Sequence, residues 1–170
     1  MALLPMLHTF DPRLRKKALP VEAVDRDVRV LIDDLLETNY DLDALGLAAP
    51  QAGISKRVMV VDVGEKKAGT SCPFVMVNPE IHWHSPETQV TQEGCFSVPG
   101  FYEHVTRSLE IKVSYLDEQN KHQELSASGL LADCIQHELD HLNGVLFIDH
   151  LSALRRGIIL QKLKKNKRLR

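Results

Sequence analysis

Two histidines four residues apart, His137 and His141, most constrain how this 170-residue chain can fold. In a helix of about 3.6 residues per turn they lie about 40° apart, so both imidazoles can reach one metal ion. Glu138 completes the order His-Glu-x-x-His, in which the carboxylate is typical of a general base acting on metal-bound water. Apolar residues recur around the motif at helical spacing, and Gly144 is placed to end the helix. The pattern predicts a hydrolase with half of a metal site on a buried helix.

Two histidines leave a tetrahedral catalytic site one protein ligand short. The extended zinc-protease pattern requires a histidine at position 147, where this chain has Phe147, and no glutamate follows Glu138. Asp149 and His150 are formal candidates, but they lie just beyond the end of the predicted helix. The missing ligand is therefore expected upstream, where the chain has cysteines at positions 72, 95 and 134.

Cys95 and Cys134 are the cysteines nearest to this chemistry in the sequence. Cys95 follows a glycine and precedes Pro99 and Gly100. A rigid segment of this kind suits a metal thiolate, although a buried inert thiol has the same signature. Cys134 shares the helical face of the two histidines, but its side chain leans toward the helix N-terminus and away from the ion. We therefore predict that Cys134 forms the wall of a pocket.

Three motifs, in this order and at these separations, resemble those of the peptide deformylase family. They are Gly46-Leu47-Ala48-Ala49-Pro50-Gln51, Glu93-Gly94-Cys95-Phe96-Ser97 and Gln136-His137-Glu138-Leu139-Asp140-His141. Similarity continues at residues 10–15 and 146–149, so the resemblance spans nearly the whole chain. It implies a metal-dependent hydrolase that removes the N-terminal formyl group from the formyl-methionine of nascent polypeptides and releases formate.

The resemblance also implies a role for each site residue. One divalent metal ion would be held by Cys95, His137 and His141, and metal-bound water would attack the formyl carbon. Fe²⁺ is the expected physiological ion, and Zn²⁺, Ni²⁺ and Co²⁺ are compatible with the same donors. The catalytic residues would be Glu138 as general base, with the Gln51 side-chain amide and the Phe96 backbone N–H holding the oxyanion. Substrate would be bound by the backbone of Gly46 and by a methionine pocket lined by Leu45, Leu130 and Cys134.

Two other functional classes compete with this interpretation. A metallopeptidase of another type is the alternative function, and Phe147 together with the missing downstream glutamate disfavours it. A catalytically inactive relative that binds metal or the ribosome is the other alternative, and the presence of all five chemical positions disfavours that one. Glu93 and Arg107 match a structural pair of the family and are expected to brace the cysteine segment.

Two departures from the family pattern give chain-specific expectations. Ala44 occupies a position where the family has glycine, so a positive φ there would be strained. Asp133 lies on the helical face of the metal ligands, where many bacterial relatives carry an apolar residue. Because an unpaired buried carboxylate is costly, we predict that Asp133 turns outward to water or a basic partner; a polar pocket rim is the alternative.

Hydrophobic patterning predicts one α+β domain over residues 1–170, with mostly antiparallel strands around a buried metal-binding helix and helices at the N- and C-terminal ends. A content of 44% hydrophobic and 26% charged residues is ordinary for a globular protein. Besides the metal helix, the pattern predicts helices over residues 21–38 and from residue 152. The predicted strands cover residues 56–62, 74–78, 88–93, 109–116 and 122–125, with a polar loop over residues 64–69.

The C-terminal end is strongly basic, although the net charge of the chain is −2. Eight lysines and arginines and no acid follow Ser152. A solvated tail explains this pattern as well as a contact with ribosomal RNA, which the resemblance supports. The chain has no signal-like N-terminus, no apolar stretch of membrane length and an odd number of cysteines. We therefore expect a cytoplasmic monomer that binds no membrane.

Overall fold

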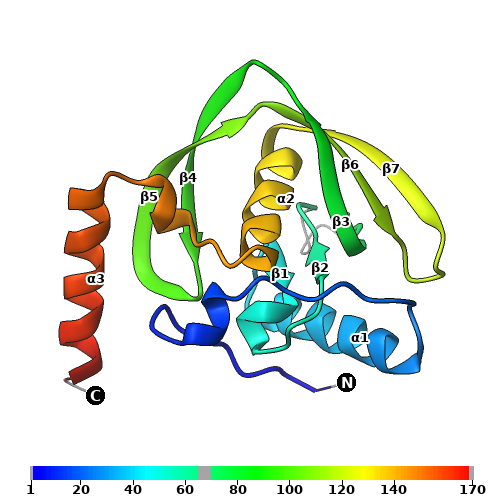
Figure 1. Ribbon diagram of the computed structural model, residues 1–170, viewed down its shortest axis with the longest axis horizontal. Helices are drawn as coiled ribbons and strands as arrows, with labels where there is room; N and C mark the ends of the chain where they lie inside the picture. The colour runs from blue at the N-terminus through cyan, green and yellow to red at the C-terminus, as the bar shows by residue number, and fades with distance from the viewer. Residues whose placement is uncertain (1, 65–69, 169–170) are drawn as a thin grey trace.

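The computed structural model describes residues 2–64 and 70–168 and has the predicted α+β architecture (Figure 1). One antiparallel sheet has the strand order β1-β2-β3-β6-β7, and β4 and β5 form a separate antiparallel pair. Helix α2 (Gly129–Leu142) lies between the two sheets, with α1 (Arg26–Asp41) and α3 (Ala153–Arg168) toward the two ends of the chain. The strands are β1 (Gly46–Ala48), β2 (Val58–Val61), β3 (Phe74–His84), β4 (Thr88–Cys95), β5 (Val98–Ser108), β6 (Glu110–Leu116) and β7 (His122–Ser128).

Helix α1 begins later than the hydrophobic pattern predicted, because Asp25 caps it. The Asp25 side chain accepts a hydrogen bond from the backbone N–H of Val28 over 2.9 Å, as an N-cap residue does. Val21 and Val24 are buried in the same core as the helix, but in the chain that precedes it. Their spacing imitates a helical face, so the predicted start at residue 21 was wrong.

Strand β5 was missed by the sequence analysis. It pairs with β4 from Thr88 opposite Ser108 to Gly94 opposite Tyr102. Few of its side chains are buried, so the sequence shows no alternation of apolar and polar residues over this segment. The other predicted strands are present, although β3 runs on to His84. The predicted loop over residues 64–69 falls largely outside the described residues.

Helix α2 is anchored in the core through the side chains that face away from the histidines. Ala132, Ile135 and Leu142 are fully buried in one hydrophobic cluster with residues of β2, β3, β6 and β7. Gly144 has φ +76°, so the left-handed position predicted after the helix is confirmed. The rigid core therefore fixes the opposite face of α2 against β4 (Figure 1).

Ala44 does not adopt the strained backbone that the family pattern suggested. The left-handed residue is its neighbour Asp43, with φ +51°, and aspartate tolerates that conformation better than most residues. Ala44 is buried, and its N–H donates to the carbonyl of Asn39 over 2.9 Å. The loop that leads into β1 therefore accommodates alanine.

Helix α3 packs against the β4–β5 side of the molecule (Figure 1). Ile159 and Leu163 lie in a cluster with Val98, Val105 and Phe147. Among the described residues, no helix has the length and apolar character needed to cross a bilayer.

Candidate active site

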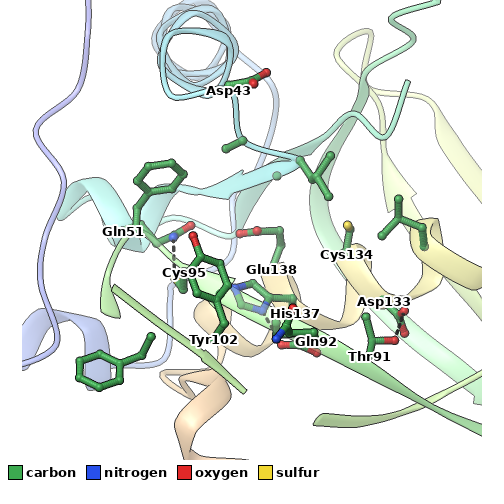
Figure 2. Close-up of a pocket in the computed structure, with 18 of the residues that line it drawn as sticks. Asp43, Gln51, Thr91, Gln92, Cys95, Tyr102, Asp133, Cys134, His137 and Glu138 are labelled. Atoms are coloured by element: carbon green, nitrogen blue, oxygen red, sulfur yellow. Dashed lines mark hydrogen bonds and ion pairs between the residues drawn. The ribbon is translucent and has the colours of Figure 1, made fainter. Parts of the chain in front are cut away.

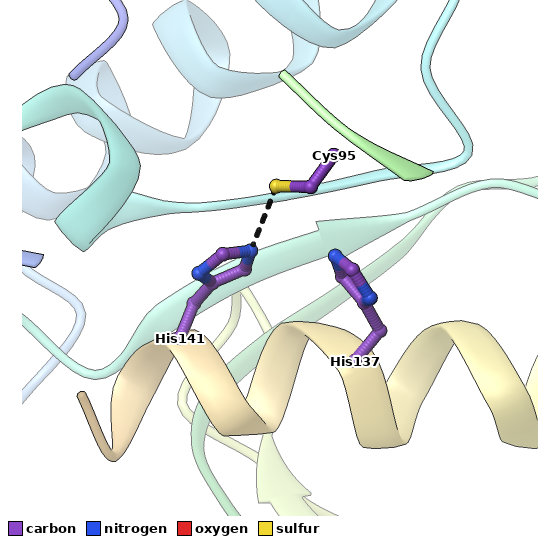
Figure 3. A group of neighbouring side chains, drawn as sticks. All are labelled: Cys95, His137 and His141. Carbon is purple, nitrogen blue, oxygen red and sulfur yellow. Dashed lines mark hydrogen bonds between the residues drawn. The ribbon is translucent and has the colours of Figure 1, made fainter. Parts of the chain in front are cut away.

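Three side chains from two separate segments form a compact donor cluster (Figure 3). His137 and His141 come from α2, and their rings meet edge to face with centroids 5.0 Å apart. Cys95 ends β4 at a register shift, and its Sγ lies 3.3 Å from Nε2 of His141. One potential ligand atom of each residue lies within 4.8 Å of the others. Of the three cysteines, Cys95 is the one that the fold brings to the histidines.

The chemistry of this donor set fits a divalent transition metal. One sulfur and two imidazole nitrogens leave a fourth tetrahedral position open. Burial raises the pKa of the Cys95 thiol, but His141 and His137 more than offset this effect and hold that pKa well below its ordinary value. The thiolate, which is the form that binds metal, is therefore favoured where the ion would bind.

Contacts behind the cluster fix the orientation of His137. Its Nδ1–H donates to Glu93 Oε2 over 2.7 Å, which leaves Nε2 as the metal-binding atom. Arg107 donates to both oxygens of Glu93, over 2.7 and 3.0 Å, and also to Asp140 over 2.7 Å. Burial alone would raise the pKa of Glu93, but His137 and Arg107 lower it to about 2. Glu93 is thus a buried carboxylate that links the cysteine segment to the metal helix.

Glu138 and Gln51 flank the donor cluster. Burial raises the pKa of Glu138 to about 7, against the opposing effect of the two histidines. The Gln51 side-chain oxygen accepts a hydrogen bond from Ala48 N–H over 2.8 Å, and its Nε2 lies 3.5 Å from Cys95 Sγ. The Gln51 amide therefore presents its donor end toward the cluster.

Comparison with known proteins decides the family. Residues 3–157 match the polypeptide deformylase family. The chain belongs to this family. It is 51% identical over 169 residues to peptide deformylase of Nitrosococcus oceani, covering 99% of both chains, and 53% identical over 165 residues to that of Cellvibrio japonicus, covering 97% of this chain and 96% of the relative.

Solved deformylase structures share the whole fold. The crystal structure of a peptide deformylase from Legionella pneumophila has a TM-score of 0.90 and 45% identity, covering 99% of this chain and 97% of that one. The deformylase of Ehrlichia chaffeensis in complex with actinonin has a TM-score of 0.93 and 40% identity, with 99% of each chain covered. The resemblance to peptide deformylase is therefore confirmed, and so is the α+β fold.

In this deformylase-family chain, a cavity of ≈ 590 Å³ opens beside the donor cluster (Figure 2). Every side chain or backbone predicted to bind substrate lines it, namely Leu45, Gly46, Leu130 and Cys134. Gln51, Cys95, Phe96, His137 and Glu138 line it as well. The Phe96 side chain is half exposed where it lines the cavity. The fold thus brings the predicted catalytic and substrate-binding residues to one hollow.

Asp133 does not turn outward, so that prediction was wrong. Its side chain is only 5% exposed, it lines the cavity, and its Oδ2 accepts a hydrogen bond from Thr91 Oγ1 over 2.6 Å. The outward prediction failed because β4 passes along this face of α2 and supplies a hydroxyl donor. Burial of the carboxyl group is thereby made less costly.

Sequence reasoning missed Tyr102, and it considered His150 only as a formal candidate for the metal ligand. Tyr102 lines the cavity and is 68% exposed (Figure 2). It lies across the β4–β5 ladder from Gly94, where an added Cβ would approach the Tyr102 ring to 2.4 Å. His150 Nε2 donates to Asp140 Oδ2 over 2.7 Å and so extends the Arg107 network to the surface. Only the register of β5 could have indicated Tyr102, and that strand was not predicted.

Proposed function

We propose that this chain hydrolyses the N-terminal formyl group of formyl-methionyl nascent peptides and releases formate. One observation carries the proposal: the donor cluster of Cys95, His137 and His141 lies beside Glu138 at a cavity large enough for a peptide side chain. Membership of the polypeptide deformylase family supports the same reaction. We propose further that residues 1–170 act as a single catalytic domain.

The proposed cofactor is one divalent metal ion, held by Sγ of Cys95 and the imidazoles of His137 and His141. Fe²⁺ is the proposed physiological ion, and Zn²⁺, Ni²⁺ and Co²⁺ suit the same donors. When bound, such an ion supplies Lewis acidity that brings the pKa of a water toward neutrality. Glu93 would raise the basicity of His137 and hold its ring in place.

Glu138 is the proposed general base. With a pKa raised to about 7, it can both accept and release a proton near neutral pH. It would take the proton of the attacking water and deliver it to the peptide nitrogen as the C–N bond breaks. Nε2 of Gln51 and the backbone N–H of Phe96 would donate to the developing oxyanion. Each donor of this kind can contribute roughly 3 kcal/mol to transition-state stabilisation.

Substrate binding would use both backbone and side chains. The backbone at Gly46 would pair with the formyl peptide as an added strand. Leu45, Leu130 and Cys134 would surround the methionine side chain, and all three line the cavity.

The remaining proposals concern partners and location. Because the proposed substrate is a nascent chain, the proposed place of action is the cytoplasm. The basic helix α3, whose described residues do not line the cavity, is the proposed ribosome contact. We propose that the enzyme acts as a monomer, because the donor cluster and the cavity are built from residues of one chain.

Turnover of a formylated peptide tests this function directly. Protein purified without oxygen should release formate from formyl-Met-Ala-Ser and leave the peptide bonds of unformylated Met-Ala-Ser intact. Cleavage of the unformylated peptide would instead support a metallopeptidase. Glu138→Ala should retain the metal and lose turnover. Metal content measured on the same samples tests the iron proposal, which full activity only with Zn²⁺ would overturn.

A further inference from the structure

Thr91 and Asp133 form a polar pair in the wall of the cavity (Figure 2). The Thr91 hydroxyl on β4 donates to Oδ2 of Asp133 on α2 over 2.6 Å. The second oxygen of Asp133, Oδ1, accepts no hydrogen bond from any residue in the described part of the chain. Leu130 and Cys134, from the same helix, line the cavity beside it. A buried carboxyl group with one unsatisfied oxygen thus borders a partly apolar hollow.

An unsatisfied buried acceptor favours ligands that bring a hydrogen-bond donor. The thioether of methionine has no donor, so a methionine side chain leaves Oδ1 of Asp133 unsatisfied. A side-chain amide has nearly the same length and carries two N–H donors. Oδ1 has almost no accessible surface of its own, so the Asp133 carboxylate would turn toward the cavity to meet the amide at the cavity wall.

We propose that Asp133 determines specificity for the first residue of the substrate, by accepting a hydrogen bond from a first side chain that ends in an amide. The cavity then accepts formyl-glutaminyl peptides as well as formyl-methionyl peptides. This inference rests on the proposed function, because it assigns the hollow around Leu130 and Cys134 to the first side chain. Thr91 has a positioning role, since its hydroxyl occupies Oδ2 and leaves Oδ1 for the substrate.

The test compares two formyl peptides of similar shape, formyl-Met-Ala-Ser and formyl-Gln-Ala-Ser. Their kcat/KM values are measured with the metal-loaded wild-type protein and with Asp133→Leu. We expect the leucine variant to lower the ratio of the glutaminyl to the methionyl value by about tenfold or more, which equals about 1.4 kcal/mol of transition-state binding. A ratio that stays within about threefold of wild type contradicts the proposal.

Two further variants separate specificity from structural support. Thr91→Val removes the hydroxyl that orients Asp133 but keeps the carboxylate, so the ratio of the glutaminyl to the methionyl kcat/KM should fall by less than it does in Asp133→Leu. If the pair only holds β4 against α2, Thr91→Val and Asp133→Leu will lower both kcat/KM values by the same factor, which contradicts the proposal. Asp133→Asn keeps the size of the side chain and replaces the leucine variant if that variant does not fold. It should lower the ratio of the glutaminyl to the methionyl kcat/KM by a smaller factor than Asp133→Leu. An unchanged ratio counts against the proposal.

The wild-type measurement also distinguishes a failure of this inference from a failure of the proposed function on which it rests. Hydrolysis of both peptides with a ratio insensitive to Asp133 contradicts the inference alone. Hydrolysis of neither peptide contradicts the proposed function, and with it the assignment of the cavity on which the inference depends.

Discussion

A single methyl group at Gly46 would test whether the first motif makes room for Glu138. A Cβ at this position would lie 2.8 Å from both Cγ and Oε1 of Glu138. Non-bonded carbon atoms prefer separations of about 3.5–4.0 Å, so the Glu138 side chain would have to move by about 1 Å. Gly46 does not have a left-handed φ, so alanine adds no backbone strain of its own.

The expected result of Gly46→Ala is a large loss of turnover with the metal retained. A displacement of about 1 Å at a catalytic group can lower the rate by about 100-fold. The atoms nearest to the new methyl group all belong to Glu138 and none to the donor cluster, so metal content should not change. Steady-state hydrolysis of formyl-Met-Ala-Ser, with metal analysis on the same sample, measures both. Gly157→Ala in α3 is the matched control, because a Cβ there meets nothing within 4 Å.

A double-mutant cycle with Glu138→Ala separates the steric clash from lost pairing with the substrate backbone. Overpacking should cost about 1–3 kcal/mol of unfolding free energy in the wild-type background. It should cost little once the Glu138 side chain is truncated, because the clashing atoms are gone. Chemical denaturation of all four proteins gives the coupling. Equal destabilisation by Gly46→Ala in both backgrounds, or a kcat within about threefold of wild type, would refute the steric argument.

Three further predictions address stability. Arg107→Met leaves Glu93 buried without its cation, so chemical denaturation should show a loss of about 3–5 kcal/mol in the free energy of unfolding. Competition with a chelator should show that metal affinity falls about 10–100-fold. Burial raises the pKa of Asp62, but hydrogen bonds from hydroxyl and backbone donors more than offset burial, so the net pKa is lowered. The stabilisation from these hydrogen bonds is present above the unfolded pKa of about 3.9 and is lost as the pH falls. The Tm deficit of Asp62→Asn should therefore be largest near neutral pH and should narrow in acid. Gly144→Ala places a Cβ 2.6 Å from the carbonyl oxygen of Arg15 at φ +76°, and thermal unfolding should show a cost of about 1–3 kcal/mol.

The half of the site that lies on one helix could be predicted from the sequence alone. His137 and His141 are brought together by local geometry, since residues four apart share a helical face in any α-helix. Gly144 could be predicted for the same reason, because the end of a helix has a local signature. Cys95 is different: helix geometry disfavoured Cys134, but the rigid segment around Cys95 also suited an inert buried thiol, so the choice of this ligand depended on the resemblance.

The elements that could not be predicted depend on long-range pairing. Strand β5 carries few buried side chains, and its position follows from hydrogen bonds to β4 rather than from its own pattern. Tyr102 reaches the cavity through that pairing. The burial of Asp133 likewise depends on a strand that lies 42 residues away in the sequence. A carboxylate on a helix was assigned to solvent because its partner was not local.

The partners of α2 nevertheless follow a simple geometric match with β4. Side chains on one face of a strand repeat about every 6.6 Å, and helix residues four apart repeat about every 6 Å. A strand lying along a helix can therefore contact it at three consecutive steps before the two repeats diverge. The three contacts, in order along both elements, are Thr91 with Asp133 at 2.6 Å, Glu93 with His137 at 2.7 Å and Cys95 with His141 at 3.3 Å. Once Cys95 lies beside His141, the same register places Thr91, four residues earlier in β4, beside Asp133, eight residues earlier in α2. The metal cluster and the polar pair of the cavity wall thus belong to one series of contacts between β4 and α2. A shift of β4 by one residue would break both.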